Sequence, residues 1–118
     1  MKVIQDKFDV IVAGEFIEHL NPSDVKISLN EFYRVLKNKG RLILTTPNPD
    51  YIKLKFTGGT VIHGAHLSEH KIQVLANQLS DIGFKVKKIL GTGKVSKILG
   101  QHFPFINIYG SYMLIADK

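Results

Sequence analysis

Two apolar runs, FDVIVA at residues 8–13 and RLILTT at residues 41–46, decide the fold of this chain of 118 residues. Both runs are rich in aliphatic residues and stop at a strand-breaking residue, Gly14 in the first case and Pro47 in the second. Between them, the segment NPSD at residues 21–24 is typical of a helix start. The sequence therefore predicts a strand, a helix and a second, parallel strand.

The predicted helix runs from a cap at Asn21 to a left-handed stop at Gly40. Four apolar residues at spacings of four, three and four form its buried stripe: Val25, Leu29, Phe32 and Leu36. The run at residues 8–13 is almost entirely apolar, which is typical of a strand that is buried on both faces of a parallel sheet.

The rest of the chain predicts further elements of the same α/β class. They are a long loop over 47–67, a helix from a cap at Ser68 to Gly83, a strand over 85–90 and a closing strand over 112–116. No internal repeat interrupts this order, and we expect residues 1–118 to form one domain.

Composition excludes several classes of protein. The chain has no cysteine, so disulfides and thiolate metal sites are ruled out. No apolar run approaches the roughly 20 residues that a membrane-spanning helix needs, and the polar N-terminus is unlike a signal peptide. We therefore expect a cytoplasmic protein without a membrane span.

The formal charge of +6 comes from 16 Lys and Arg against 10 Asp and Glu. These basic residues are spread along the chain, and aromatic residues are not interleaved with them as a nucleic-acid surface requires. We interpret them as solvated surface charge. A basic nucleic-acid-binding domain remains the lesser alternative.

Four segments together resemble class I S-adenosylmethionine-dependent methyltransferases of the type 11 group. They are FDVIVAGEFIEHL at 8–20, FYRVLKNKGRLILTTPNP at 32–49, the helix-forming segment at 66–84 and GSYMLIA at 110–116. The segments occur in the order of that family and cover nearly the whole chain.

The resemblance implies the C-terminal half of a Rossmann-like methyltransferase domain. Such a half has parallel strands flanked by helices, a final antiparallel strand, and none of the family's first three strands. The Gly-rich turn and the ribose-binding acid of the family are missing from this sequence, and GTG at 91–93 is no substitute because no helix start follows it. We therefore expect this chain alone to bind S-adenosylmethionine poorly or not at all.

The resemblance also implies a cofactor site where the first strand ends. In the family, the backbone at this point contacts the methionine part of S-adenosylmethionine, which corresponds here to Ala13, Gly14 and Glu15. A glycine allows close approach of a ligand to the backbone. The alternative is that Gly14 only forms a turn.

Glu18, His19 and His66 are implied to line the pocket of the methyl acceptor, a small molecule, lipid or glycan precursor. His19 has two open roles: a base that takes a proton from a hydroxyl acceptor, or a side chain that orients the loop beside a carboxylate. The histidines at 63, 66 and 70 have a spacing compatible with a metal, but acidic support is sparse and we predict no metal site.

In the family the first strand pairs with the fourth, so the run from Phe8 to Ala13 is expected to be a bare apolar edge. An unprotected edge pairs readily with another chain. We therefore expect a homo-oligomer, or a complex with a separate N-terminal half, through this edge. A non-catalytic methyltransferase-like interaction module remains the main alternative to an enzyme.

Overall fold

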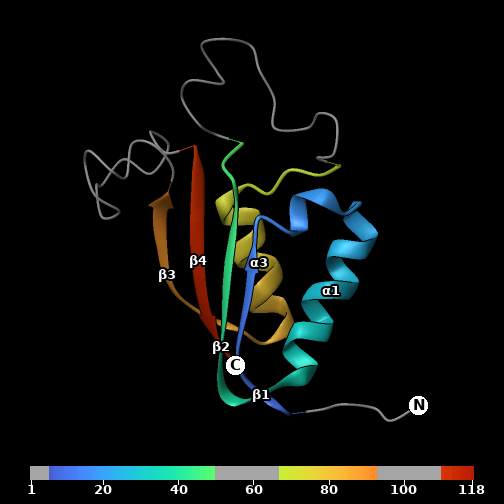
Figure 1. The fold of residues 1–118 in the computed structure, drawn as a ribbon, viewed down its shortest axis with the longest axis vertical. Coiled ribbons are helices and arrows are strands. Elements are labelled where there is room, and N and C mark those ends of the chain that lie inside the picture. Colours follow the sequence, from blue (N-terminus) through green and yellow to red (C-terminus); the bar gives the residue numbers. More distant parts are fainter. Residues whose placement is uncertain (1–5, 50–66, 93–109) are drawn as a thin grey trace.

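The computed structural model describes residues 6–49, 67–92 and 110–118, which form a four-stranded sheet with two helices packed against one face (Figure 1). The elements in chain order are β1 (Phe8–Gly14), the 3-10 helix η1 (Ile17–His19), α1 (Pro22–Val35), β2 (Leu36–Pro47), α3 (Ile72–Ile82), β3 (Lys85–Thr92) and β4 (Ser111–Asp117). In these ranges, no helix has the length and apolar character needed to cross a membrane.

The sheet has the strand order β1-β2-β4-β3. β1 and β2 are parallel, with Ile11 opposite Leu42 and Gly14 opposite Thr45. β4 is antiparallel to both of its neighbours, β2 and β3. The predicted parallel pair, the antiparallel final strand and the α/β class are thus confirmed, and β1 lies at one edge of the sheet.

α1 begins as the sequence predicts and ends earlier. The side chain of Asn21 accepts a hydrogen bond of 2.9 Å from the backbone N–H of Asp24, which caps the helix. The predicted stop at Gly40 is wrong, because the helix ends at Val35 and β2 follows at once. The left-handed residue is Lys39, with φ 67°; a Cβ on Gly40 would lie 2.7 Å from the carbonyl oxygen of residue 37. Gly40 is therefore needed for close packing and not as a helix stop.

α3 also starts later than the sequence predicts. Its N-cap residue is Lys71, which makes no side-chain cap, so the assignment of Ser68 as the cap is wrong. The Ser68 hydroxyl instead donates to the carbonyl of Ile17, at 3.2 Å. The predicted stop at Gly83 is confirmed: its φ is 127°, and its N–H reaches two carbonyls of the last helical turn.

The core lies between the two helices and one face of the sheet. Fully buried side chains there come from α1, α3 and the central strands: Val25, Leu29, Leu42, Leu44, Leu75, Leu79, Tyr112 and Leu114. The alternating burial along β4 shows that its other face is only partly covered.

The exposure of side chains on that other face contradicts one prediction from the sequence. Val10 and Val12 are 53% and 67% exposed, so β1 is not buried on both faces. Val12 pairs with Ile43, and Ile43 pairs with Ile115, so an apolar row continues from exposed side chains on β1 to half-buried ones on β2 and β4. We call this surface the open face; no described helix covers it (Figure 1).

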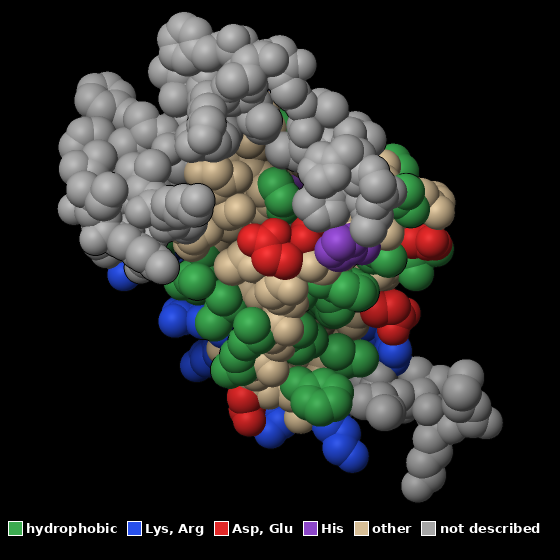
Figure 2. Space-filling view, turned by 45° about the horizontal axis from the view of Figure 1, so that its top comes forward, with side chains coloured by type: hydrophobic (Ala, Val, Ile, Leu, Met, Phe, Trp, Pro, Cys, Tyr) green, Lys and Arg blue, Asp and Glu red, His purple; other side chains and the backbone are tan. Residues whose placement is uncertain are grey.

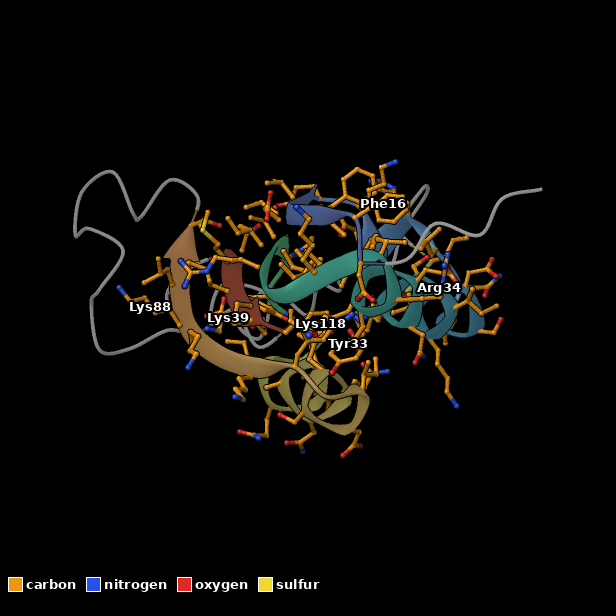
Figure 3. The ribbon with its side chains drawn as sticks, turned by 90° about the horizontal axis from the view of Figure 1, so that it is seen from below. Phe16, Tyr33, Arg34, Lys39, Lys88 and Lys118 are labelled. Atoms are coloured by element: carbon orange, nitrogen blue, oxygen red, sulfur yellow. The ribbon has the colours of Figure 1, made fainter. Side chains whose placement is uncertain are left out.

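Tyr33 of α1 packs beside Lys118, the last described residue (Figure 3). Its ring packs edge-on against Phe84, with ring centroids 5.0 Å apart, and the ammonium of Lys118 lies 4.7 Å from the ring centre. Lys118 also donates to the carbonyl of Leu36 at 2.7 Å and pairs with Asp6. This corner joins α1, β2, the turn between α3 and β3, and the last described residue.

Candidate functional site

The ends of β1 and β2 meet at one edge of the sheet, and the chain turns sharply there. Glu15 adopts a left-handed backbone conformation with φ 48°. Its N–H donates both to the carbonyl of Thr45, at 3.0 Å, and to the Thr45 hydroxyl, at 2.9 Å. A left-handed conformation costs a non-glycine residue about 1–2 kcal/mol, and such strain concentrates at functional sites.

Gly14 is exposed and has no packing reason to be glycine in the described structure. A Cβ placed on it would meet only the Thr45 hydroxyl, at an ordinary contact distance of 3.7 Å. Its φ is not positive either, so the turn itself requires no glycine at this position. Gly14 borders a shallow cavity of about 350 Å³ whose other lining residues are Ile11, Val12, Ala13, Phe16 and Phe32.

Glu18 is a buried carboxylate beside this turn. Its side chain is 1% exposed, and the Thr46 hydroxyl donates to Oε2 at 3.0 Å. Its other oxygen, Oε1, is buried without a hydrogen-bond partner. Burial of a charged group with one unsatisfied oxygen lowers the stability of the fold, so stability alone does not explain the position of Glu18.

A network of polar contacts holds Glu18 in place. Its backbone carbonyl accepts hydrogen bonds from the N–H groups of Leu67 and Ser68, at 2.7 and 3.2 Å. The Ser68 hydroxyl lies 2.9 Å from Nε2 of His70, and the Tyr112 hydroxyl donates to the His70 carbonyl at 2.7 Å. Four residues of this network were not predicted from the sequence as parts of the site: Thr46, Ser68, His70 and Tyr112.

Three pKa values near Glu18 are displaced. Desolvation of the carboxyl group, followed by contact with the Glu18 carboxylate, raises the pKa of Glu15 to about 7, although the residue as a whole is exposed. Burial and the same carboxylate raise the pKa of Tyr112, and burial lowers the pKa of His70. His70 and Tyr112 are therefore neutral near pH 7, whereas Glu15 titrates there.

Replacing Glu15 by Gln should flatten the pH dependence of stability. The folded chain holds a proton on Glu15 that the unfolded chain has lost between the ordinary pKa of 4.5 and about 7, so this group's contribution falls as the pH rises through that window. We expect Glu15→Gln to be more stable than the parent at pH 8, by about 1 kcal/mol after solvent screening, and equal to it at pH 4. Urea unfolding at both pH values measures this, and an equal difference at the two pH values would contradict it.

His19 lies at the surface beside the two carboxyl groups. Its side chain is 44% exposed, and its Nε2 is 3.7 Å from Oε1 of Glu18. That distance is long for a hydrogen bond and suits an ion pair when the imidazole is protonated. Figure 2 shows acidic and histidine side chains side by side on this face.

The structure thus brings together Ala13, Gly14, Glu15, Glu18 and His19 at the end of β1. His66, the other residue predicted at the acceptor pocket, lies outside the described residues, as does His63. Within the described part of the chain, no group of three or more His, Cys, Asp or Glu side chains has an arrangement that could hold a metal ion.

One family model and a number of solved structures match this chain. The model of a family described as a methyltransferase domain matches residues 2–89. Among solved structures, a SAM-dependent methyltransferase from Archaeoglobus fulgidus is 20% identical, with a TM-score of 0.67 over 97% of this chain. A possible histamine N-methyltransferase from Thermotoga maritima is 18% identical, with a TM-score of 0.70 over the whole chain.

Magnesium protoporphyrin IX methyltransferase from Synechocystis PCC 6803, solved with SAH bound, is 19% identical, with a TM-score of 0.64 over 98% of this chain. The chain spans only 61%, 59% and 47% of these three structures, in the order given. A search of curated protein sequences found no match. The likeness in structure therefore concerns the fold of part of a larger domain.

Proposed function

Because the chain belongs to the family of SAM-dependent methyltransferases, we propose that the end of β1 binds the methionine part of S-adenosylmethionine. The observation that carries this proposal is the open backbone at Gly14, where a side chain would fit within the protein and yet none is present. Ala13 and Glu15 flank this point, so their backbone groups would also lie beside a ligand bound there.

The residues fit the methionine part of the cofactor and not the remainder. S-adenosylmethionine, when bound, supplies an activated methyl group; the chain's own residues would position it and exclude water. The sequence has no Gly-rich turn and no ribose-binding acid in the family's pattern, so we propose that another segment completes the site. Affinity of this chain alone should be weak.

We further propose an acceptor that is a small molecule, lipid or glycan precursor, bound near Glu18, His19 and His66. One protein of the same fold is a magnesium protoporphyrin IX methyltransferase, and another is described as a possible histamine N-methyltransferase. His19 would either accept a proton from the acceptor or orient the loop through its contact with Glu18. The absence of cysteine is compatible with our proposal of a cytoplasmic setting.

A titration with S-adenosylhomocysteine, followed by amide NMR at millimolar ligand, tests the cofactor site. We expect shifts at Ala13, Gly14 and Glu15 that saturate as the ligand is added. Gly14→Ala should leave the free energy of unfolding within about 0.5 kcal/mol of the parent, because its Cβ has room. The affinity measured from these shifts should fall by about tenfold or more, because the methyl group blocks approach of the ligand to the backbone.

The matched control for that experiment is Ser80→Ala, which lies on α3 away from the site and should change neither stability nor ligand shifts. Shifts confined to other parts of the chain, or a Gly14→Ala variant that binds as well as the parent, would overturn the cofactor assignment. Absence of any shift would favour the non-catalytic alternative.

We also propose that β1 and the open face form an interface with a second copy of the chain or with a separate N-terminal half. Support comes from the exposed side chains of Val10 and Val12 and from the position of β1 at the sheet edge. Figure 2 shows hydrophobic side chains gathered on the near face, with Lys and Arg around its lower border.

A further inference from the structure

Two carboxyl groups lie over the inner strands of the sheet, one strand away from the cavity beside Gly14. Glu18 is bonded to Thr46 at the end of β2, and Glu15 interacts with Ser111 at the start of β4. The cavity beside Gly14 lies instead at the outer edge, along β1. The carboxyl pair is therefore placed for a second ligand rather than for the one that contacts the Gly14 backbone.

The pair contains a buried acceptor that needs a donor. Oε1 of Glu18 has no hydrogen-bond partner, and His19 approaches it only to 3.7 Å. When Glu15 carries a proton, its O–H can donate to the Glu18 carboxylate and replace the missing partner. A ligand that brings both N–H donors and positive charge would satisfy Oε1 and reduce the repulsion between the two carboxyl groups.

We propose that the methyl acceptor is an amine whose ammonium group binds between Glu15 and Glu18, and that Glu15 then accepts one of its protons. This inference rests on the proposed function. In the proton transfer, an N–H bond breaks, its electron pair stays on nitrogen, and an O–H bond forms on Glu15. The nitrogen thereby gains the lone pair that a methyl acceptor requires.

The surroundings of Glu15 support this role. Its pKa of about 7 suits a base that works near neutral pH. The other titratable groups that interact with the pair are His19 from η1, His70 and Tyr112. The contacts from β2 are the uncharged hydroxyls of Thr45 and Thr46. No described lysine or arginine is paired with either carboxyl group, so the site keeps its preference for a cation.

The test is an NMR titration of the full chain labelled with ¹³C at its glutamate carboxyl groups. Benzylamine is the probe, and benzyl alcohol is its uncharged counterpart of equal size. Benzylamine should lower the midpoint at which Glu15 titrates, because the ammonium favours the ionised carboxyl group. Its affinity should be about tenfold higher at pH 8 than at pH 6, because the carboxyl group must lose its proton to bind. Benzyl alcohol should do neither.

Variants separate the site from general charge effects. Glu18→Gln keeps the shape of the side chain and removes its charge, and it should weaken benzylamine binding by at least about tenfold. Glu15→Gln should remove the pH dependence as well as most of the affinity. Glu31→Gln, which removes an exposed carboxylate on α1, is the matched control and should bind as the parent does. An unchanged amide spectrum elsewhere establishes that each variant is folded.

Three results would overturn the inference: an unchanged Glu15 midpoint, an equal response to benzyl alcohol, or a response that requires an added divalent metal. S-adenosylhomocysteine provides the second arm, because it carries its own ammonium group. If S-adenosylhomocysteine changes the midpoint at which the Glu15 carboxyl group titrates and benzylamine does not, the pair belongs to the cofactor site and the proposal of an amine acceptor is wrong. Shifts at Gly14 report on the proposed function separately, so the two ideas fail in distinguishable ways.

Discussion

Gly83→Ala is expected to lower the free energy of unfolding by about 2–5 kcal/mol. Gly83 has φ 127°, a conformation that residues with a Cβ rarely adopt, and the new methyl group would lie 2.7 Å from the Tyr33 hydroxyl. Strain and overpacking therefore act together, in the corner where Tyr33 also contacts Phe84 and Lys118. Urea unfolding of parent and variant measures the loss.

The corner offers an internal control for this prediction. Tyr33→Phe removes the hydroxyl nearest to the new methyl group, so part of the penalty of Gly83→Ala should disappear in the double variant. Gly14→Ala is the matched glycine change at a site with room for a Cβ. A loss below about 1 kcal/mol for Gly83→Ala would show that the Tyr33 ring moves aside at little cost.

Val10→Lys is expected to disrupt association of the chain, with the association constant falling by about a hundredfold or more. Val10 is 53% exposed on the edge strand, and a partner strand or helix packed there would have to bury the new ammonium group. Light scattering over a range of concentrations should show a dimer of the parent shifting to monomer or to irregular aggregate.

Ile27→Lys is the control for surface charge. Ile27 is 60% exposed on α1, away from β1, so the same change in charge should leave association unaffected. A parent chain that stays a clean monomer at high concentration would remove the self-association form of the proposal. Binding of a separately produced N-terminal half would then have to be measured with the same two variants.

The order and type of the elements could be predicted from the sequence because the signals are local. Asn21 caps α1 through a contact three residues away, and Gly83 ends α3 through contacts within one turn. The strands at Phe8–Gly14 and Ser111–Asp117 are marked by apolar runs that are bounded by turn residues. Such features are set by backbone chemistry that acts over a few residues.

The errors arose where tertiary contacts decide. The left-handed conformation predicted for Gly40 is found at Lys39 instead. Gly40 packs directly against backbone carbonyls. Ser68 has the chemistry of a helix cap, yet its hydroxyl bonds to Ile17, about fifty residues earlier in the chain. Neither contact can be predicted from local sequence, because each depends on the tertiary fold.

The candidate site was likewise predictable where its residues are close in sequence, and not where tertiary contacts decide. The resemblance placed Gly14, Glu15, Glu18 and His19 together because they are close in sequence. The burial of Glu18 went unpredicted, since charged residues are seldom fully buried, and its partner Thr46 lies on the next strand. The raised pKa of Glu15 comes first from its own partial burial and then from its contact with the Glu18 carboxylate, both of which depend on the tertiary fold.

The position of β4 has a consequence for how the chain acquires its structure. β4 is the last strand along the sequence, yet it lies between β2 and β3. Until it is synthesised and docked, one edge of β2 and the whole of β3 lack a pairing partner within the described sheet. Contacts between strands so distant in sequence form slowly, so β2 and β3 would each keep an unpaired edge that can pair with other chains until β4 docks.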